Sequence, residues 1–406
     1  MGDFIDDFAV KATDKVEQHV QLQVATKQSM ASSQFGLNHR PIYVPGNRVY
    51  PRNDASASNH TMGSSIFRYL EIKVHEAVLE RPYNEIIVMG AYSRHKGTSI
   101  AFEGEKRDKP FNWERPTARL DPETDTLFIE CFPGYDHIEH YAEIIACFLR
   151  LLEEEQEKPE KDKSAANVVR RPLTPSSRVA FIPASCSDTR LALCNDTNLD
   201  LFPGEGVHTV VLGQVWHLGS ITQEQGKSET VWEGEGPFQW VIKTFPSLSG
   251  SGATTSRKVA FLGFRPAFWG CISGELIHLL ASRFPSIREV IYLGKLGTLT
   301  PGVAPNRHLA TGSSSLLSGS VGRVVEWENV LAGAVERRAP AGVVISGRHV
   351  TLGSVLHETK DWHADLKETV EFVDPEIGMM AQAGMSPLST SFRFSPKTST
   401  QTNQVT

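Results

Sequence analysis

The sequence predicts an α/β fold in which a mostly parallel sheet is flanked by helices. Short apolar runs rich in β-branched residues recur along the chain between Gly and Pro residues, and such runs are typical of strands buried on both faces. Stretches with apolar residues every three or four positions alternate with these runs, and this alternation favours a parallel sheet. At 406 residues, the chain is long enough to bury two cores.

Shifts in composition divide the chain into five expected segments. Residues 1–63 are rich in Gln, Asn, Ser and His and form a flexible N-terminal arm, because they bury too little apolar surface to offset the entropy of ordering. Residues 64–155 form an N-terminal α/β block, and a charge-dense linker follows at 156–176. A larger α/β domain spans 177–385. The Ser/Thr-rich residues 386–406 form a flexible tail.

The N-terminal block begins with a helix in which one apolar residue recurs every four positions, at Ile66, Leu70, Val74 and Val78. A strand, a turn, a second strand and a helix are expected to follow at 84–92, 121–126, 126–132 and 140–155. After the first strand, residues 93–97 (SRHKG) form either an anion-binding loop or a solvated basic loop.

The larger domain repeats the alternation of strand and helix. Strands are expected at RVAFIPAS (178–185), HTVVLGQVW (208–216), KVAFLGF (258–264), EVIYLGKLG (289–297) and GVVISGRHVTLGSVL (342–356). Helices are expected at ISGELIHLLASRF (272–284) and EIGMMAQAGM (376–385).

Composition narrows the classes of function. The formal net charge of −6 gives no long-range attraction to nucleic-acid phosphate. The five cysteines form no CxxC pair and no Cys/His cluster at zinc spacing, so we expect no metal, no cofactor and a reduced, cytoplasmic protein. The acidic start and the lack of an apolar run of ~18 residues argue against secretion and membrane insertion.

Three stretches carry candidate site residues. In EVIYLGKLG, an apolar strand is expected to end in a sharp turn at Gly294, Lys295 and Gly297, and ligands of α/β sheets collect at the carboxyl ends of strands. Sharp turns also need glycine where nothing binds. In FVDPEIG, Asp374 and Glu376 lie at the start of an expected helix, and helix capping explains both residues. The Glu376 carboxylate could also accept two hydrogen bonds from a vicinal diol.

The third stretch is the loop HETKDWH, which carries His357 and Asp361 after a strand. Both are candidate catalytic residues. His357 and His363 are six positions apart without a third ligand at a familiar spacing, so a metal site is not expected, and surface or core histidines are the common alternative.

In order, EVIYLGKLGTLTPGVAPNRHLATGSSS, GVVISGRHVTLGSVLHETKDW and VEFVDPEIGMMAQAG resemble three regions of the nucleoside phosphorylase and nucleosidase superfamily. The resemblance covers the C-terminal half of the chain and implies a phosphorylase-like domain at 177–385. It implies that the glycine-rich stretch touches the sugar and that Glu376 hydrogen-bonds the ribose hydroxyls.

The sequence departs from that family at two places. The strand before the glycines has Tyr292, and the glycine stretch has Lys295, where phosphorolytic members have a phosphate-binding arginine; lysine lacks the planar fork of arginine, so a nucleosidase-like reaction is favoured. The chain after Gly384 also lacks the family's acid for the departing base, so Asp361 or His357 is the expected replacement.

The expected function is therefore an enzyme that binds a small ribosyl substrate, nucleoside or nucleotide-like, and cleaves or transfers at the glycosidic bond. One alternative is an arginine-containing cyclodipeptide synthase of secondary metabolism, which would use the same fold to hold the aminoacyl-adenosine end of a transfer RNA. Another is a non-catalytic nucleoside sensor. A homo-oligomer is compatible with all three.

Overall fold

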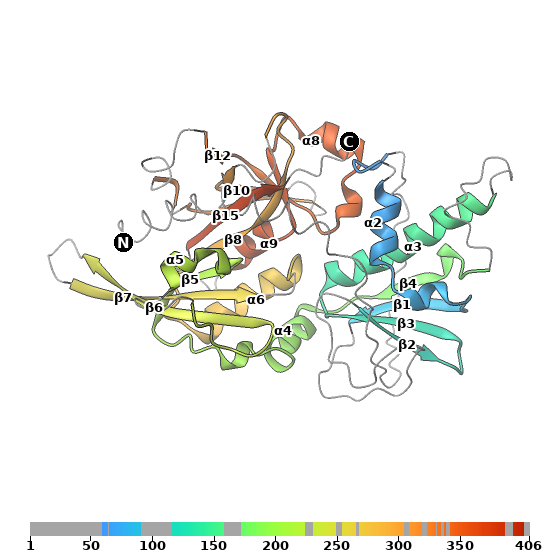
Figure 1. Cartoon of the computed structure of the whole chain (residues 1–406), viewed down its shortest axis with the longest axis horizontal. Coiled ribbons are helices and arrows are strands. Elements are labelled where there is room, and N and C mark those ends of the chain that lie inside the picture. The colour runs from blue at the N-terminus through green and yellow to red at the C-terminus, as the bar shows by residue number, and fades with distance from the viewer. Residues whose placement is uncertain are drawn as a thin grey trace. The chain divides into compact units, whose positions relative to one another are not determined.

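The computed structural model of the chain (Figure 1) describes residues 59–63, 65–90, 116–157, 172–223, 230–248, 254–264, 268–303, 308–318, 323–329, 331–333, 337, 342–385 and 393–401. Within these, unit 1 comprises Leu193–Leu352 and 365–401, and unit 2 comprises 59–192 and Gly353–Ala364. Most of the expected N-terminal arm and linker, and the SRHKG loop at 93–97, lie outside the described residues.

Unit 2 contains a four-stranded sheet in the order β2-β3-β1-β4. Its strands are β1 (Glu85–Gly90), β2 (Thr117–Asp121), β3 (Thr126–Cys131) and β4 (Val179–Ile182). Its helical elements are α2 (Ser65–Lys73), η1 (Glu76–Leu79), α3 (Tyr135–Glu157), η3 (Ser176–Arg178) and η6 (Val355–His357). The unit boundary falls within α4 (Cys186–Asn195) and α8 (Lys360–Leu366).

The two faces of this sheet are both buried. Alternate residues such as Ile86 and Ile129 face the core that the sheet shares with α2 and α3, and α3 lies along that face (Figure 1). Ile87 and Phe128 belong to a second cluster, on the opposite face. The central strands are therefore continuous apolar runs, which is why the sequence pattern locates them.

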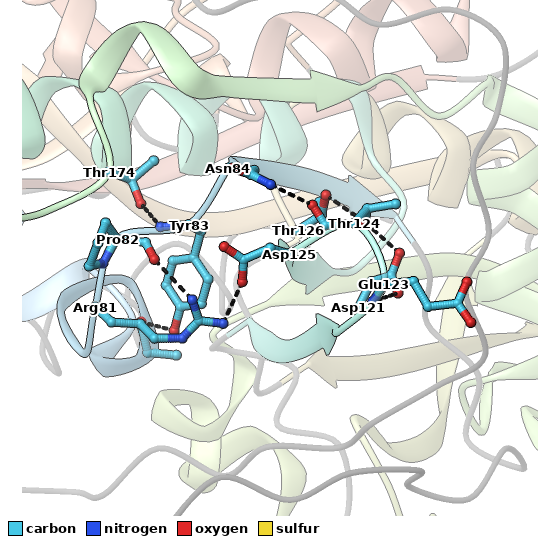
Figure 2. A network of polar contacts seen from close by, with 11 residues as sticks. Arg81, Pro82, Tyr83, Asn84, Asp121, Glu123, Thr124, Asp125, Thr126 and Thr174 are labelled. Carbon is cyan, nitrogen blue, oxygen red and sulfur yellow. Dashed lines mark hydrogen bonds and ion pairs between the residues drawn. The ribbon is translucent and has the colours of Figure 1, made fainter.

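Two strands of unit 2 differ from expectation. β4 belongs to the RVAFIPAS run, which was expected in the larger domain, but it pairs in parallel with β1. β2 was not expected as a strand, because TARLD contains no apolar run or regular alternation. It pairs antiparallel with β3, and a network of polar contacts fixes the turn between them (Figure 2).

Unit 1 contains an eleven-stranded sheet. Its strands are β5 (Val207–Gly213), β6 (Phe238–Leu248), β7 (Thr254–Phe264), β8 (Glu289–Thr298), β9 (Leu309–Thr311), β10 (Ser314–Leu317), β11 (Arg323–Glu326), β12 (Val344–Ser346), β13 (His349–Thr351), β14 (Phe372–Asp374) and β15 (Arg393–Gln401). Its helical elements are η4 (Leu199–Leu201), η5 (Val215–Leu218), α5 (Gly219–Thr222), α6 (Cys271–Arg283) and α9 (Ile377–Gly384).

β8 is the central strand of the sheet in unit 1. It pairs in parallel with β5 and β15 and antiparallel with β14. Parallel pairs also join β5 to β7, β9 to β12 and β13 to both β10 and β14. α6 packs against α9, with Gly274 facing the backbone of Met379. The expected α/β class, with a mostly parallel sheet flanked by helices, is confirmed.

Two local expectations in unit 1 are wrong. The sharp turn at Gly294 and Gly297 does not occur: β8 runs through both glycines to Thr298, because β15 on one edge and β14 on the other supply hydrogen-bonding partners there. Residues 393–401 were expected in a flexible tail, but they form β15, which pairs with β8 and β9. An unpaired strand edge is a template for such pairing, even for a polar sequence.

Candidate functional site

The candidate site of unit 1 lies where β5 and β14 share one edge of β8. β15 occupies the other edge over Glu289–Gly297. On the shared edge, β5 pairs with β8 as far as Leu293, and β14 begins to pair at Gly297. The part of β8 between these two positions, which includes Gly294, therefore has no strand partner on that edge among the described residues.

Asp374 ends β14 and fixes the start of α9. Its Oδ1 accepts hydrogen bonds from the backbone amides of Glu376, at 2.9 Å, and Ile377, at 2.5 Å. Its Oδ2 lies 3.4 Å from Nδ1 of His349, and both side chains are fully buried. Asp374 therefore caps α9, as its position in the sequence predicted. Its hydrogen bonds also fix the backbone of Glu376.

Glu376 occupies the N-cap position of α9, but its side chain makes no capping hydrogen bond. Its backbone holds the loop in place, since the carbonyl accepts hydrogen bonds from Ser273 Oγ at 3.3 Å and from the Met380 amide at 3.0 Å. The side chain is half-buried, and its Oε2 atom is buried without a hydrogen-bond partner. Burial, and after it the charge of Asp374, raises the pKa of Glu376 well above its usual value.

Tyr292 connects Glu376 to the glycine of β8. A Cβ atom placed on Gly294 would lie 2.5 Å from the Tyr292 hydroxyl oxygen, so the absence of a side chain at Gly294 leaves space for this ring. The Tyr292 side chain is buried, and its pKa is raised by burial and then by the charges of Glu376 and Asp374. The phenol and both carboxyl groups therefore belong to one neighbourhood, next to the unpaired stretch of β8.

Lys295 and Gly297 lie differently. Successive side chains of a strand point to opposite faces, so Lys295 shares a face with Leu293 rather than with Tyr292 and Gly294. Leu293 packs in the cluster of Val211 and other residues on that face. Lys295 is half-buried, and this burial lowers its pKa. Gly297 contributes backbone pairing to β14, opposite Val373.

The two candidate catalytic residues, His357 and Asp361, belong to unit 2, and each contacts a residue of that unit. His357 Nε2 lies 2.9 Å from Glu143 Oε1 of α3. Asp361 is exposed and accepts a hydrogen bond from Asn59 Nδ2 at 3.0 Å. The structure therefore places the carboxyl groups near β8 in one unit and these two residues in the other.

A polar cluster that the sequence did not indicate surrounds His357 in unit 2. His140 Nδ1 lies 2.8 Å from Ser354 Oγ, and its Nε2 lies 3.5 Å from the Tyr69 hydroxyl. Burial lowers the pKa of His140 to about 3 and raises that of Glu358 to about 7. These contacts attach the segment Gly353–Ala364 to α2 and α3, and the low pKa of His140 keeps its ring neutral at physiological pH.

The described parts of the chain were also searched for metal sites and for membrane-spanning helices. No group of three or more His, Cys, Asp or Glu residues there is arranged to hold a metal ion. None of the helices described combines the length and the apolar character that a membrane crossing needs.

The comparisons with known proteins find a likeness to solved structures. No family model matches the chain, and no curated protein matches it. Among solved structures, a P. knowlesi homologue of P. falciparum PNP aligns over 50% of this chain and 81% of its own length, with 14% identity and a TM-score of 0.34. That similarity assigns no family, and the α/β class rests on the strands and helices of the chain itself.

Proposed function

We propose that unit 1 binds a ribosyl ligand, nucleoside or nucleotide, through Glu376 and cleaves or transfers at its glycosidic bond. The observation that supports this most is the state of the Glu376 carboxyl group. Its Oε2 is buried without a hydrogen-bond partner, and it does not cap its own helix. A buried polar atom without a partner is costly, and such atoms are therefore common where a ligand binds.

The vicinal hydroxyls of a ribose match this acceptor. Two hydroxyl groups can each donate a hydrogen bond to one carboxylate, and hydrogen bonds to an ionised group are the stronger kind. Such donors favour the ionised form, so ligand binding lowers the raised pKa of Glu376. Cleavage at the anomeric carbon builds positive charge on the sugar, and a carboxylate held in place beside it lowers that barrier electrostatically.

The charges near β8 favour water or another neutral acceptor over phosphate. The two charges that raise the Tyr292 pKa, besides its burial, are the carboxylates of Glu376 and Asp374. Lys295, the cation of this strand, lies on the opposite face. A phosphate anion beside Tyr292 would meet the charges of these carboxylates, whereas a water molecule is neutral, so a nucleosidase-like reaction fits better than phosphorolysis.

The proposed site takes its residues from unit 1. Glu376 contacts the ribose hydroxyls, Gly294 leaves the space that the Tyr292 ring occupies, and the neutral Tyr292 phenol can donate a hydrogen bond to the ligand. Asp374 is a positioning residue, because its carboxylate holds the amides that begin α9. His357 and Asp361, with their partners in unit 2, are left out of this set.

Release of free base from a panel of nucleosides and nucleotides tests the proposal. We expect the parent protein to release base from at least one ribonucleoside or ribonucleotide, and Glu376→Gln to reduce that rate by at least ~100-fold. Glu371→Gln is the matched control. Glu371 directly precedes β14, and its carboxylate accepts a hydrogen bond from the Arg348 amide. The rate of base release by Glu371→Gln should therefore stay within a few-fold of the parent rate.

Two outcomes count against the proposal. One is base release that Glu376→Gln leaves at the parent rate. The other is turnover that appears when aminoacyl-tRNA is supplied and disappears with ribonuclease, with no base released in its absence.

A further inference from the structure

Arg119 of β2 is a buried cation that uses only its Nε–H as a hydrogen-bond donor. Its side chain is 1% exposed, and its Nε lies 3.2 Å from Glu130 Oε1. The guanidinium carbon lies over the Phe128 ring, 4.0 Å from its centre, in a cation–π contact. Both terminal nitrogens, Nη1 and Nη2, are buried and have no hydrogen-bond partner.

A second unsatisfied group lies on the same face of the sheet. Thr117 is two residues before Arg119 on β2, so strand alternation gives both side chains one face, and the Thr117 Oγ1 atom is likewise buried without a partner. Buried N–H and O–H groups without hydrogen-bond partners destabilise the folded state, because they lose their bonds to water and gain none in return. The ion pair with Glu130 is made through Nε, and it leaves the N–H groups of both Nη atoms without an acceptor.

The register of β2 places Thr117 beside the ends of two parallel strands in unit 2. Thr117 pairs with Glu130, which in turn pairs with Met89 at the end of β1. The carboxyl ends of β1 and β3 therefore lie beside Thr117, and ligands of α/β sheets bind outside such ends.

The turn between β2 and β3 fixes that register (Figure 2). Asp121 accepts hydrogen bonds from the Glu123 amide and from Thr124 Oγ1. Asp125, in the left-handed region at a φ of 54°, forms an ion pair with Arg81 at 2.6 Å. These contacts hold β2 against β3, so Arg119 cannot slip out of register with Phe128.

We propose that Arg119 and Thr117 form a binding site for a phosphate group. The Glu130 carboxylate occupies the Nε side of the guanidinium, which leaves the two Nη groups as a planar pair of donors. A tetrahedral phosphate offers oxygens to both, and a third oxygen can exchange a hydrogen bond with the Thr117 hydroxyl. The site lies within unit 2 and is independent of the ribosyl ligand proposed for unit 1.

Equilibrium dialysis of the full chain against inorganic phosphate, AMP and adenosine tests the site. The dialysis runs overnight, because the groups are buried and entry of the ligand needs a local opening. We expect saturable binding of phosphate or of AMP, against a chloride control of equal ionic strength. AMP binding that is tighter than phosphate binding, persists in Glu376→Gln and is lost in Arg119→Lys would identify a phosphomonoester as the ligand of this site, and the reverse order of affinities would identify the free ion.

Two variants and one control connect the binding to these residues. Arg119→Lys keeps the charge but loses the fork, so phosphate or AMP affinity should fall at least ~10-fold. Thr117→Val removes an unsatisfied hydroxyl, so it should weaken phosphate while leaving the ligand-free protein as stable as the parent, or more so. Arg68→Lys, at the exposed ion pair with Glu71 in α2 of the same unit, should change neither.

The site is wrong if the parent protein binds neither phosphate nor AMP saturably, or if both Arg119→Lys and Thr117→Val bind as tightly as the parent. Glu376→Gln changes unit 1 alone, so this variant should bind phosphate as the parent does. A failure of the ribosyl site can therefore be told apart from a failure of the phosphate site.

Discussion

Glu376→Gln should raise the thermal stability of the ligand-free protein while it removes activity. The folded state raises the pKa of Glu376 above the usual 4.5, so the folded protein binds a proton more tightly than the unfolded chain does. Stability is therefore greatest when the carboxyl is protonated. This contribution to stability decreases as the pH rises from the pKa of the unfolded chain to the pKa of the folded protein. Glutamine does not titrate, so it avoids this loss.

The measurement is the unfolding temperature of both proteins from about pH 5 to about pH 9. We expect the advantage of Glu376→Gln over the parent to increase with pH, and Glu371→Gln to show no such increase. Loss of activity with gain of stability is the signature of a residue kept for function at the expense of the fold. A variant that is less stable at every pH would mean that the carboxylate supports the fold.

Gly213→Ala should destabilise unit 1 severely. Gly213 ends β5 with a φ of 109°, which residues with a side chain rarely adopt, and an added Cβ would meet the Leu293 carbonyl oxygen. That oxygen also accepts a hydrogen bond from the Gln214 amide at 2.8 Å, so it cannot move away without a further loss. We expect a loss of at least ~3 kcal/mol in the free energy of unfolding.

Chemical denaturation of Gly213→Ala beside Gly302→Ala measures this effect. Gly302 has a φ of 80°, but nothing lies within 4 Å of an added Cβ, so that variant should lose about 1–2 kcal/mol from backbone strain alone. Equal losses of stability in the two variants would mean that the end of β5 is not packed tightly against β8. The position of the unpaired stretch at Gly294 would then not be fixed by β5.

The sequence predicts the elements that are apolar and periodic. α3 and α6 follow from apolar spacing, and β1, β5 and β8 follow from runs buried on both faces. β2 and β15 do not, because TARLD and RFSPKTSTQ are polar, and a sheet edge that needs hydrogen bonds decides their structure. The same cause explains the wrong turn in β8, where two neighbouring strands keep a glycine-containing segment extended.

The candidate site was predictable as far as local pattern reaches. The capping role of Asp374 follows from the order of residues at a helix start. The sugar-binding role of Glu376 is what the family resemblance implies, and it stays a prediction. The role of Tyr292 could not be predicted from the sequence, because it depends on the missing side chain at Gly294 and on charges from a distant segment of the chain. Arg119 gives no signal either, since a lone arginine in a polar stretch is ordinarily exposed.

Calorimetric binding of adenosine and 2′,3′-dideoxyadenosine to the parent and to Glu376→Gln tests the central claim most directly, because the pair of ligands differs in the ribose hydroxyls alone. We predict that the parent binds adenosine at least ~10-fold more tightly than the dideoxy analogue, and that Glu376→Gln removes most of that difference. A preference for adenosine that is the same in both proteins, or no binding of either ligand to the parent, would contradict the assignment of Glu376 to the sugar.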